Sequence, residues 1–317
     1  MEAERGLCRM AATGRAARES QGPSGPPARR AGACGKIAPA MADTLADFDL
    51  ACRAAALYVY PVKACAGVAV DELVIDARGG AVGDRGWAAV DAEGAVTWLG
   101  SFPRLALVQP AFAGAGLVLN APGADPIATP AVMAPREVKI WSDVHRCQET
   151  FAAEDAGDAV AAWLERVVGA PLRLVRLEDA VHTRDGNNAL HLVFTPSMAA
   201  VQTRRAAGAL DERRFRPNIV LALPADGNEF VEESIEALAW QGAAGGETRL
   251  DVTAPCIRCV VPNVDPASAR VDETLLDTLA GMSLQRRPGG TVFGIYARGA
   301  TGTRLRVGDI ARMVPAF

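Results

Sequence analysis

The sequence predicts a mixed α/β fold that is rich in strands: an N-terminal β-barrel-like domain, a second β-barrel domain and a few helices. Three observations lead to this prediction. The apolar segments are short, glycine or proline bounds almost every one of them, and few stretches repeat with a helical period. We place the first domain at residues 51–172 and the second at residues 173–317, after an N-terminal tail over residues 1–50.

The segments expected to be strands combine β-branched or aromatic residues with flanking turn residues. They are residues 57–60, 68–70, 73–75, 87–90, 95–99, 105–108, 117–119, 138–141, 172–177, 190–194, 219–223, 238–240, 248–252, 293–296 and 304–307. Gly94 stands near the end of the short loop between two of them, which is typical of a hairpin.

Three helices are expected, over residues 154–168, 195–207 and 272–279. In the first, the apolar residues repeat on one helical face and Gly169 ends the pattern. In the second, Thr195 precedes Pro196, so we interpret Thr195 as a capping hydroxyl. The free N–H groups of that helix N-terminus would also suit a phosphate.

Composition and charge limit the function classes. The chain has 317 residues, half of them apolar, which is enough for a sizeable core. A net charge of -4 and a pI near 5.6 argue against nucleic acid or an anionic membrane as the main partner. No apolar run reaches the roughly 18 to 20 residues of a membrane helix, and a secretory signal is not evident, so we expect a cytoplasmic protein with no membrane partner.

The cysteine content indicates a reducing compartment. The composition of the N-terminal tail indicates that it does not fold. Seven cysteines are an odd number in a chain much larger than disulfide scaffolds, so we expect reduced thiols. The first 45 or so residues are rich in Ala, Gly, Arg and Pro and lack periodicity, which predicts disorder. Because Met41 stands just before the first periodic segment, one alternative is that the forty residues before it are an artefact of start-codon choice, and a basic or targeting tail is another.

The segment around Cys259 is the main candidate for chemistry. Cys256-Ile257-Arg258-Cys259 closes an apolar strand, and an arginine beside a cysteine favours the thiolate. A thiolate is a soft ligand for metals. We expect Cys256 itself to be a buried small hydrophobe.

Polar residues at strand ends are the second group of candidates. Arg216 and Asn218 directly precede the apolar segment 219–223. Arginine can place two N–H groups on a phosphate, and asparagine offers a donor and an acceptor to a heterocycle. Taken alone, the pair is more often a surface arginine and a turn asparagine than a binding site, and Lys63 and Arg85 raise the same question.

Several of these segments occur in an order that resembles the MOSC family with its N-terminal β-barrel extension. They are Tyr60-Pro61-Val62-Lys63, Asp84-Arg85-Gly86-Trp87, Pro103-Arg104-Leu105-Ala106, Arg214-Phe215-Arg216-Pro217-Asn218-Ile219-Val220, Pro255-Cys256-Ile257-Arg258-Cys259, Val264-Asp265-Pro266, Phe293-Gly294-Ile295-Tyr296 and Arg306-Val307-Gly308-Asp309. The resemblance extends over about residues 55–315.

The resemblance implies a molybdenum cofactor, in which the dithiolene of a phosphorylated pterin chelates the metal, with Cys259 as the protein ligand and catalytic residue. It further implies a set of cofactor-binding residues. They are Lys63, Arg85, Asn188, Thr195, Arg216, Asn218, Arg258 and Tyr296.

Relatives with this extension reduce N-hydroxylated compounds, so the implied reaction removes the oxygen of a hydroxylamine, amidoxime or N-hydroxylated base with two electrons and two protons. We assign no general acid among His145, His182 and His191. Some relatives continue into a ferredoxin-like domain, whereas this sequence stops at Phe317. We therefore expect a separate electron donor, a ferredoxin or a flavin reductase.

Departures from the family pattern keep other interpretations open. Ala64 replaces a serine, and Asn187-Asn188-Ala189 replaces hydroxyl residues, which affects the substrate range most. The C-x-x-C spacing allows a thiol redox pair or half a zinc site, although neither has its usual context. A carrier of sulfur or molybdenum cofactor without turnover is the stronger alternative, and pyridoxal phosphate binding is a family-level expectation.

Overall fold

The computed structural model describes residues 51–186, 189–205, 208–223, 227–241, 247–282 and 290–316, and all of them belong to one compact unit. Asn188, which we expected to contact a cofactor, lies outside these residues, as does the N-terminal tail.

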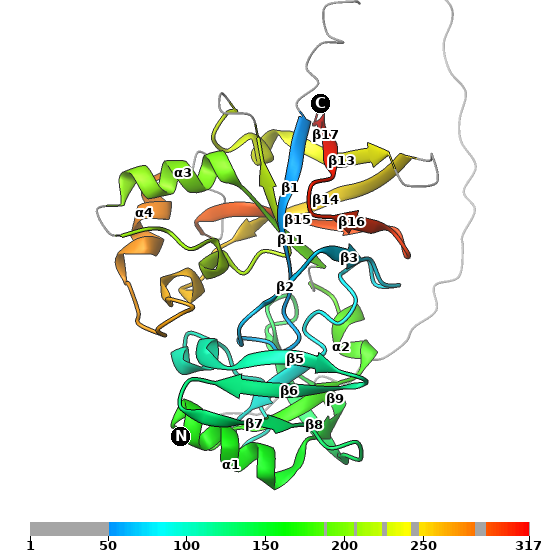
Figure 1. Cartoon of the computed structure of the whole chain (residues 1–317), viewed down its shortest axis with the longest axis vertical. Helices are drawn as coiled ribbons and strands as arrows, with labels where there is room; N and C mark the ends of the chain where they lie inside the picture. The colour runs from blue at the N-terminus through cyan, green and yellow to red at the C-terminus, as the bar shows by residue number, and fades with distance from the viewer. Residues whose placement is uncertain are drawn as a thin grey trace, which may run out of the picture. The chain divides into compact units, whose positions relative to one another are not determined.

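A closed barrel of seven strands forms one part of this unit (Figure 1). Its strands run in the order β12-β11-β15-β14-β13-β17-β1, and β1 pairs back with β12. Their bounds are β1 (Ala51–Val59), β11 (Leu190–Phe194), β12 (Ile219–Ala222), β13 (Ile235–Gln241), β14 (Glu247–Ile257), β15 (Val292–Gly299) and β17 (Ile310–Pro315). Only the β11–β12 pair is parallel among the barrel pairings described, and β2 (Val68–Val70) flanks β1.

Two further sheets and one strand pair complete the β structure. The four-stranded sheet has the order β4-β10-β9-β8, from β4 (Trp87–Val90), β10 (Arg173–Leu177), β9 (Cys147–Asp155) and β8 (Ala134–Ser142). The three-stranded sheet contains β5 (Gln109–Ala113), β6 (Gly116–Ala121) and β7 (Ala124–Ala128), and β3 (Glu72–Val74) pairs with β16 (Arg304–Arg306). The described part of the chain therefore begins in the barrel with β1, leaves it and returns with β11.

Four α-helices and four short 3-10 helices are described. They are α1 (Gly157–Val168), α2 (Asp179–Thr183), α3 (Thr195–Arg204), α4 (Thr274–Met282), η1 (Pro103–Leu107), η2 (Glu212–Phe215), η3 (Val231–Ser234) and η4 (Val261–Asn263). None of the described helices is long and apolar enough to cross a membrane.

Separate apolar cores support the barrel and the sheets outside it. Leu192, Ile219 and Ile295 are buried inside the barrel. Trp163 of α1 and Leu105 of η1 belong to a second core, against β6 and β10. Because burial of a large side chain stabilises by about 1.5 to 3 kcal/mol, each core is a substantial source of stability.

The structure confirms the strand-rich barrel prediction and corrects several boundaries. The helix expected from residue 154 begins at Gly157, because the preceding residues form β9. Residues 105–107 belong to η1 rather than to a strand, since Pro103 begins a tight turn, and Val108 follows it in extended conformation. Residues 95–99 make only isolated bridges, so that expected strand is wrong.

The expected role of Thr195 as a helix cap is also wrong. α3 starts at Thr195 itself, Phe194 occupies the preceding position, and no side-chain cap hydrogen bond is present there. The hydroxyl that makes hydrogen bonds in this region is two residues further along. Ser197 is buried, accepts a hydrogen bond from the N–H of Phe230 at 2.8 Å, and donates one to Glu232 at 2.8 Å.

The Glu232 carboxyl predicts how stability depends on pH. Burial raises its pKa from 4.5 to about 7. The folded state therefore favours the protonated acid, and the stability that this preference gives is complete below about pH 4.5 and is lost as the pH rises through 7. Glu232→Gln should remove that loss, on the order of 3 kcal/mol. Urea unfolding at about pH 5 and about pH 8 measures it.

Glu229→Gln is the matched control, because Glu229 lies three residues away, is half exposed and pairs with Arg204 at the surface. Its effect should stay within about 0.5 kcal/mol at both values of pH. An equal effect of Glu232→Gln at both values would contradict the assigned protonation of Glu232.

Candidate functional site

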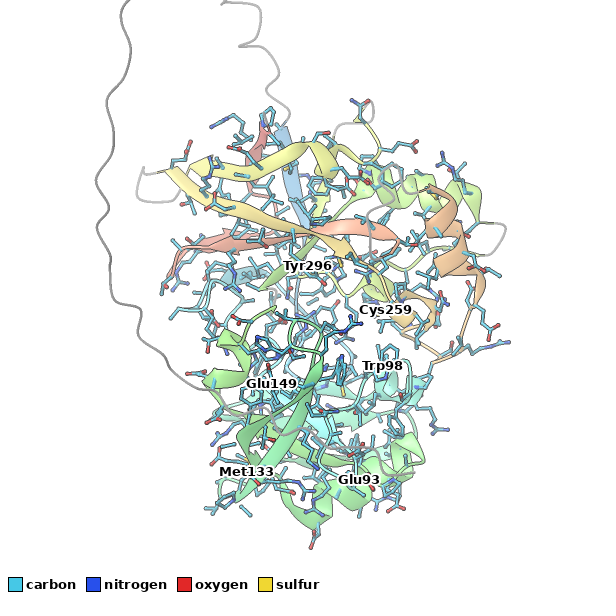
Figure 2. All side chains as sticks on the ribbon, turned by 180° about the vertical axis from the view of Figure 1, so that it is seen from behind. Glu93, Trp98, Met133, Glu149, Cys259 and Tyr296 are labelled. Carbon is cyan, nitrogen blue, oxygen red and sulfur yellow. The ribbon has the colours of Figure 1, made fainter. Side chains whose placement is uncertain are left out.

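A cavity of about 280 Å³ brings together six of the predicted site residues. They are Lys63, Arg85, Arg216, Arg258, Cys259 and Tyr296. Lys63 follows β1, Arg85 precedes β4 and Arg216 precedes β12. Arg258 and Cys259 directly follow β14, and Tyr296 is on β15. Trp98 also lines this cavity, and Figure 2 labels it with Cys259 and Tyr296. The cavity is therefore built from both halves of the sequence.

Cys259 lies in the loop that follows β14, two residues beyond the last residue of the strand, and is exposed. The register between β14 and β15 shifts twice, and the second shift falls between Pro255 and Ile257. Irregularities of this kind end the pairing and turn side chains away from the sheet. The result is a thiol at the rim of the barrel, accessible from the cavity.

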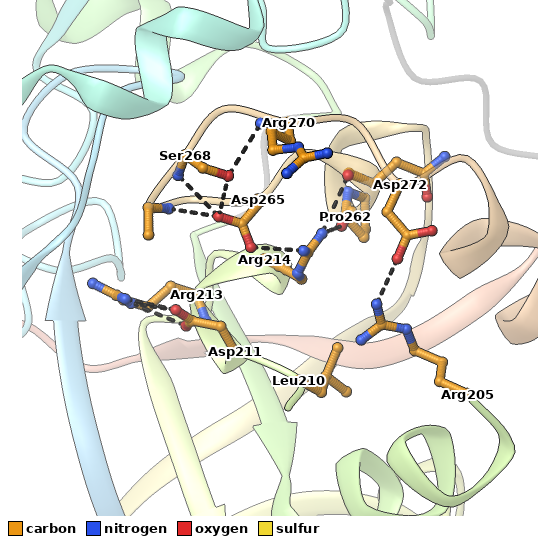
Figure 3. Close-up of polar contacts among 12 residues, drawn as sticks. Arg205, Leu210, Asp211, Arg213, Arg214, Pro262, Asp265, Ser268, Arg270 and Asp272 are labelled. Carbon is orange, nitrogen blue, oxygen red and sulfur yellow. Dashed lines mark hydrogen bonds and ion pairs between the residues drawn. The ribbon is translucent and has the colours of Figure 1, made fainter. Parts of the chain in front are cut away.

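An ion pair between Arg214 and Asp265 anchors the loop that follows Cys259 in the sequence (Figure 3). Arg214 donates to the carbonyl groups of Pro262 and Asn263 and pairs with Asp265 at 2.7 Å. The N–H and the hydroxyl of Ser268 both donate hydrogen bonds to Asp265. The Val264-Asp265-Pro266 motif thus fixes the loop that carries the thiol.

Two arginines of the cavity wall, Arg85 and Arg216, lie over the ring of Tyr60, which does not line this cavity. The guanidinium carbons of Arg216 and Arg85 lie 4.2 Å and 5.2 Å from the ring centroid of Tyr60. Both arginines have left-handed backbone conformations, with φ of 54° and 53°. Such conformations cost energy in residues other than glycine and concentrate at functional sites. Arg216 also donates to the carbonyl of Cys65 at 2.5 Å.

Asn218 supports this wall but does not line the cavity. It is fully buried, and its amide donates to the carbonyl of Tyr58 at 3.2 Å and to Asp84 at 3.1 Å. Its oxygen accepts the N–H of His191 at 3.0 Å and lies 3.5 Å from Arg85. We expected Asn218 to contact the cofactor, and that contact stays a prediction; in the structure its hydrogen-bonding groups have protein partners and support the wall.

Lys63 is a cation without a hydrogen-bond or ion-pair partner for its ammonium group in the part of the chain that is described. Burial, followed by repulsion from Arg184 and Arg85, lowers its pKa to about 8. Lys63 and Arg85 also line a second cavity of about 110 Å³, together with Arg184. Sequence reasoning missed Arg184, because it lies in an irregular segment with no motif around it.

The remaining predicted residue, Thr195, lines none of the cavities found among the described residues. Sequence reasoning also missed Trp98 and His191, which line the Cys259 cavity. The exposure of Trp98, at 41%, follows from the fold and not from a local pattern, so the sequence carried no signal for it.

Unpaired donors show which ligand the cavity fits. Nη2 of Arg216 and Nε of Arg258 are buried and lack hydrogen-bond partners among the described residues. Buried donors without acceptors are costly, so a ligand with several anionic or carbonyl oxygens would stabilise this arrangement. An exposed thiol beside such donors fits a phosphorylated ligand that carries a soft metal. The residues present therefore fit a molybdenum–pterin group.

The barrel carries a cavity in which several cationic side chains lie around an exposed thiol, and comparisons with known proteins identify the family. The MOSC N-terminal beta barrel domain matches residues 51–171, and the MOSC domain matches residues 178–312. The chain belongs to the MOSC family and combines these two domains.

Curated relatives extend over most of the chain. Mitochondrial amidoxime reducing component 2 of Rattus norvegicus is 30% identical over 295 residues, which are 81% of this chain and 82% of that protein. The Homo sapiens protein of the same name is 27% identical over 82% of this chain and 83% of its own length. Molybdenum cofactor sulfurase of Danio rerio is 25% identical over 81% of this chain but only 34% of its own length.

Replacement of Asn218 tests the supporting role described above. Asn218→Ala should lower the free energy of unfolding by about 2 to 3 kcal/mol, because it leaves buried groups of Tyr58 and His191 without a partner. Urea denaturation measures the change. Asn120→Ala removes one hydrogen bond of 3.4 Å at an exposed site and should cost less than about 0.5 kcal/mol. Equal costs in both variants would show that Asn218 is not part of the support.

Proposed function

We propose that this protein is a molybdenum-cofactor-dependent oxidoreductase that reduces N-hydroxylated compounds. The observation that carries the proposal is the convergence of an exposed Cys259 with Lys63, Arg85, Arg216 and Arg258 around one cavity. The amidoxime-reducing relatives, which match this chain over most of its length, support the choice of substrate class.

The residues of the chain divide into a metal ligand and an anion-binding set. The Cys259 thiolate would bind molybdenum, because soft sulfur donors suit that metal. Arg216 and Arg258 have free donors for the pterin or its phosphate, and Lys63 adds a positive charge to the same region. Arg85 is held by Asp84, so its contribution is a fixed positive charge.

When bound, the molybdenum cofactor would supply the two-electron chemistry that cleaves an N–O bond. The balanced reaction consumes one N-hydroxy group, two electrons and two protons, and produces one N–H group and water. The chain contributes orientation of the ligand, positive charge around it and an opening through which substrate reaches Cys259. Trp98 and Ile257, which are 41% and 48% exposed, give this opening apolar walls.

The proposal includes a separate electron donor, a ferredoxin or a flavin reductase, as we expected from the sequence. A cytoplasmic location is the corresponding expectation for this chain. Pyridoxal phosphate binding stays a family-level prediction and has no part in the proposed reaction.

A carrier function is the second candidate, and the similarity to molybdenum cofactor sulfurase favours it. A carrier would use the same cavity to hold the cofactor without turnover. The two functions separate in one reconstituted assay, with an amidoxime, an electron donor and the purified full chain. Cofactor with turnover supports the reductase, and bound cofactor without turnover supports the carrier.

Cys259→Ser tests the metal ligand. We expect molybdenum content to fall and amidoxime reduction to decrease by about 100-fold or more, because a hydroxyl is a poor replacement for a thiolate. Metal analysis, pterin fluorescence after oxidation and the reduction assay measure the effect. Cys147→Ser, on β9, is the matched control and should change neither property. Full activity of Cys259→Ser would exclude Cys259 as the ligand.

Lys63 predicts how ligand binding depends on pH. Its pKa of about 8 in the protein means that its charge is present below that value and is lost as the pH rises above it. Affinity for the phosphorylated ligand should therefore fall by about tenfold across this range. Lys63→Gln should bind weakly at every pH and lose this dependence. The rate of cofactor release as a function of pH measures both, and an unchanged profile in Lys63→Gln would contradict the assignment.

A further inference from the structure

Cys256 and His191 are two buried groups in the cavity wall that the proposed reaction does not use. Both contact Arg258. Its Nη1 donates to Sγ of Cys256 at 2.9 Å and lies 3.2 Å from Nε2 of His191, and its Nη2 donates to the carbonyl of Phe215 at 3.1 Å. A guanidinium has donors only. A hydrogen bond between the two groups therefore needs Nε2 of His191 as the acceptor.

The barrel brings these groups together through strand register. His191 on β11 pairs with Tyr296 on β15, and Cys256 is on β14, on the other side of β15. Gly294 has a φ of +76°, and a Cβ at this position would lie 2.7 Å from Nε2 of His191. Glycine is needed there both for the backbone conformation and for the space that the imidazole occupies.

Cys256 differs from the other buried cysteines of the barrel and the cavity region. Burial raises the pKa of Cys52 and of Cys65 to about 12, so both remain thiols. For Cys256, burial also acts to raise the pKa, but the charge of Arg258 and the neighbouring His191 outweigh it and hold the pKa below its usual range. The expectation that Cys256 is a small hydrophobe accounts for its burial but not for these contacts.

We propose that Cys256 and His191 are positioning residues for Arg258, which hold its guanidinium by two hydrogen bonds where it lines the cavity for the ligand. The Cys256 thiolate is then the counter-ion of Arg258 within the cavity. This inference rests on the proposed function only in naming the pterin cofactor as that ligand. The inference gives the two cysteines of the C-x-x-C segment different roles: Cys259 is the metal ligand of the proposed function, and Cys256 is the partner of Arg258.

The first experiment uses the full chain without cofactor. The ultraviolet absorbance of thiolate at neutral pH should fall by one thiolate in Cys256→Ala, and by the same amount in Arg258→Gln, because the thiol then loses its counter-ion. Cys52→Ala removes a buried cysteine that is not paired with arginine and should cause no change. Unchanged absorbance in Cys256→Ala would overturn the proposal.

The second experiment measures how fast the loaded chain releases molybdenum and pterin during dialysis. Cys256→Ala and His191→Leu should release them about tenfold faster than the parent chain, as loss of a supporting contact typically does. His191→Gln should behave like the parent, because its amide oxygen can accept from Arg258. Thermal unfolding of Cys256→Ala and Cys52→Ala shows whether packing loss alone causes release.

The two experiments distinguish failure of the inference from failure of the proposed function. If the parent chain binds neither molybdenum nor pterin, the proposed function fails, and the thiolate measurement still decides whether Cys256 pairs with Arg258. If the parent chain binds the cofactor and His191→Leu releases it no faster than His191→Gln, the positioning role is overturned.

Discussion

The concentration of positive charge around one cavity is the constraint on which the rest of the site depends. Lys63, Arg85, Arg216 and Arg258 line the same space. Like charges at short distance in a region of low dielectric repel strongly, so the fold must provide partners for them or accept a ligand that does. Asp84 pairs with Arg85, and the thiol of Cys256 accepts from Arg258. Arg216 instead lies over the ring of Tyr60, and Lys63 depends on a ligand.

A buried hydrogen-bond network makes this arrangement rigid. Asn218 connects the end of β1, through the carbonyl of Tyr58, to the loop that carries Asp84 and to the start of β11 at His191. These segments are distant in the sequence, and a fully satisfied buried network specifies their relative positions. The arginine wall and the cysteine wall of the cavity thus share one support, since His191 also contacts Arg258.

The sequence predicted most strongly those features that depend on local pattern. Residues 190–194 were expected as a strand and form β11, and Gly169 ends α1 as expected, with a φ of 83°. The predicted start of that helix was wrong because the acidic residues that favour a helix N-terminus belong to β9.

Motif order located Lys63, Arg85, Arg216, Arg258, Cys259 and Tyr296, all of which line the cavity. The positions of His191 and Arg184 depend on register and tertiary packing, so no local pattern could reveal them. Asn218 was placed in the right region, but its burial follows only from three-dimensional contacts.

The exposure of Cys259 favours turnover over storage as the use of this cavity. A carrier protects its cargo best when the ligating thiol is enclosed, whereas a reductase must admit both a substrate and electrons at the metal. Cys259 is exposed, and the neighbouring Ile257 and Trp98 offer apolar surface to an organic substrate. Gly100 lets the Trp98 ring lie close to the backbone, since a Cβ there would come within 2.4 Å of it. In the proposed reductase, an aromatic side chain held in that way is suited to contact a planar substrate, and the arginines that line the same cavity would hold the cofactor.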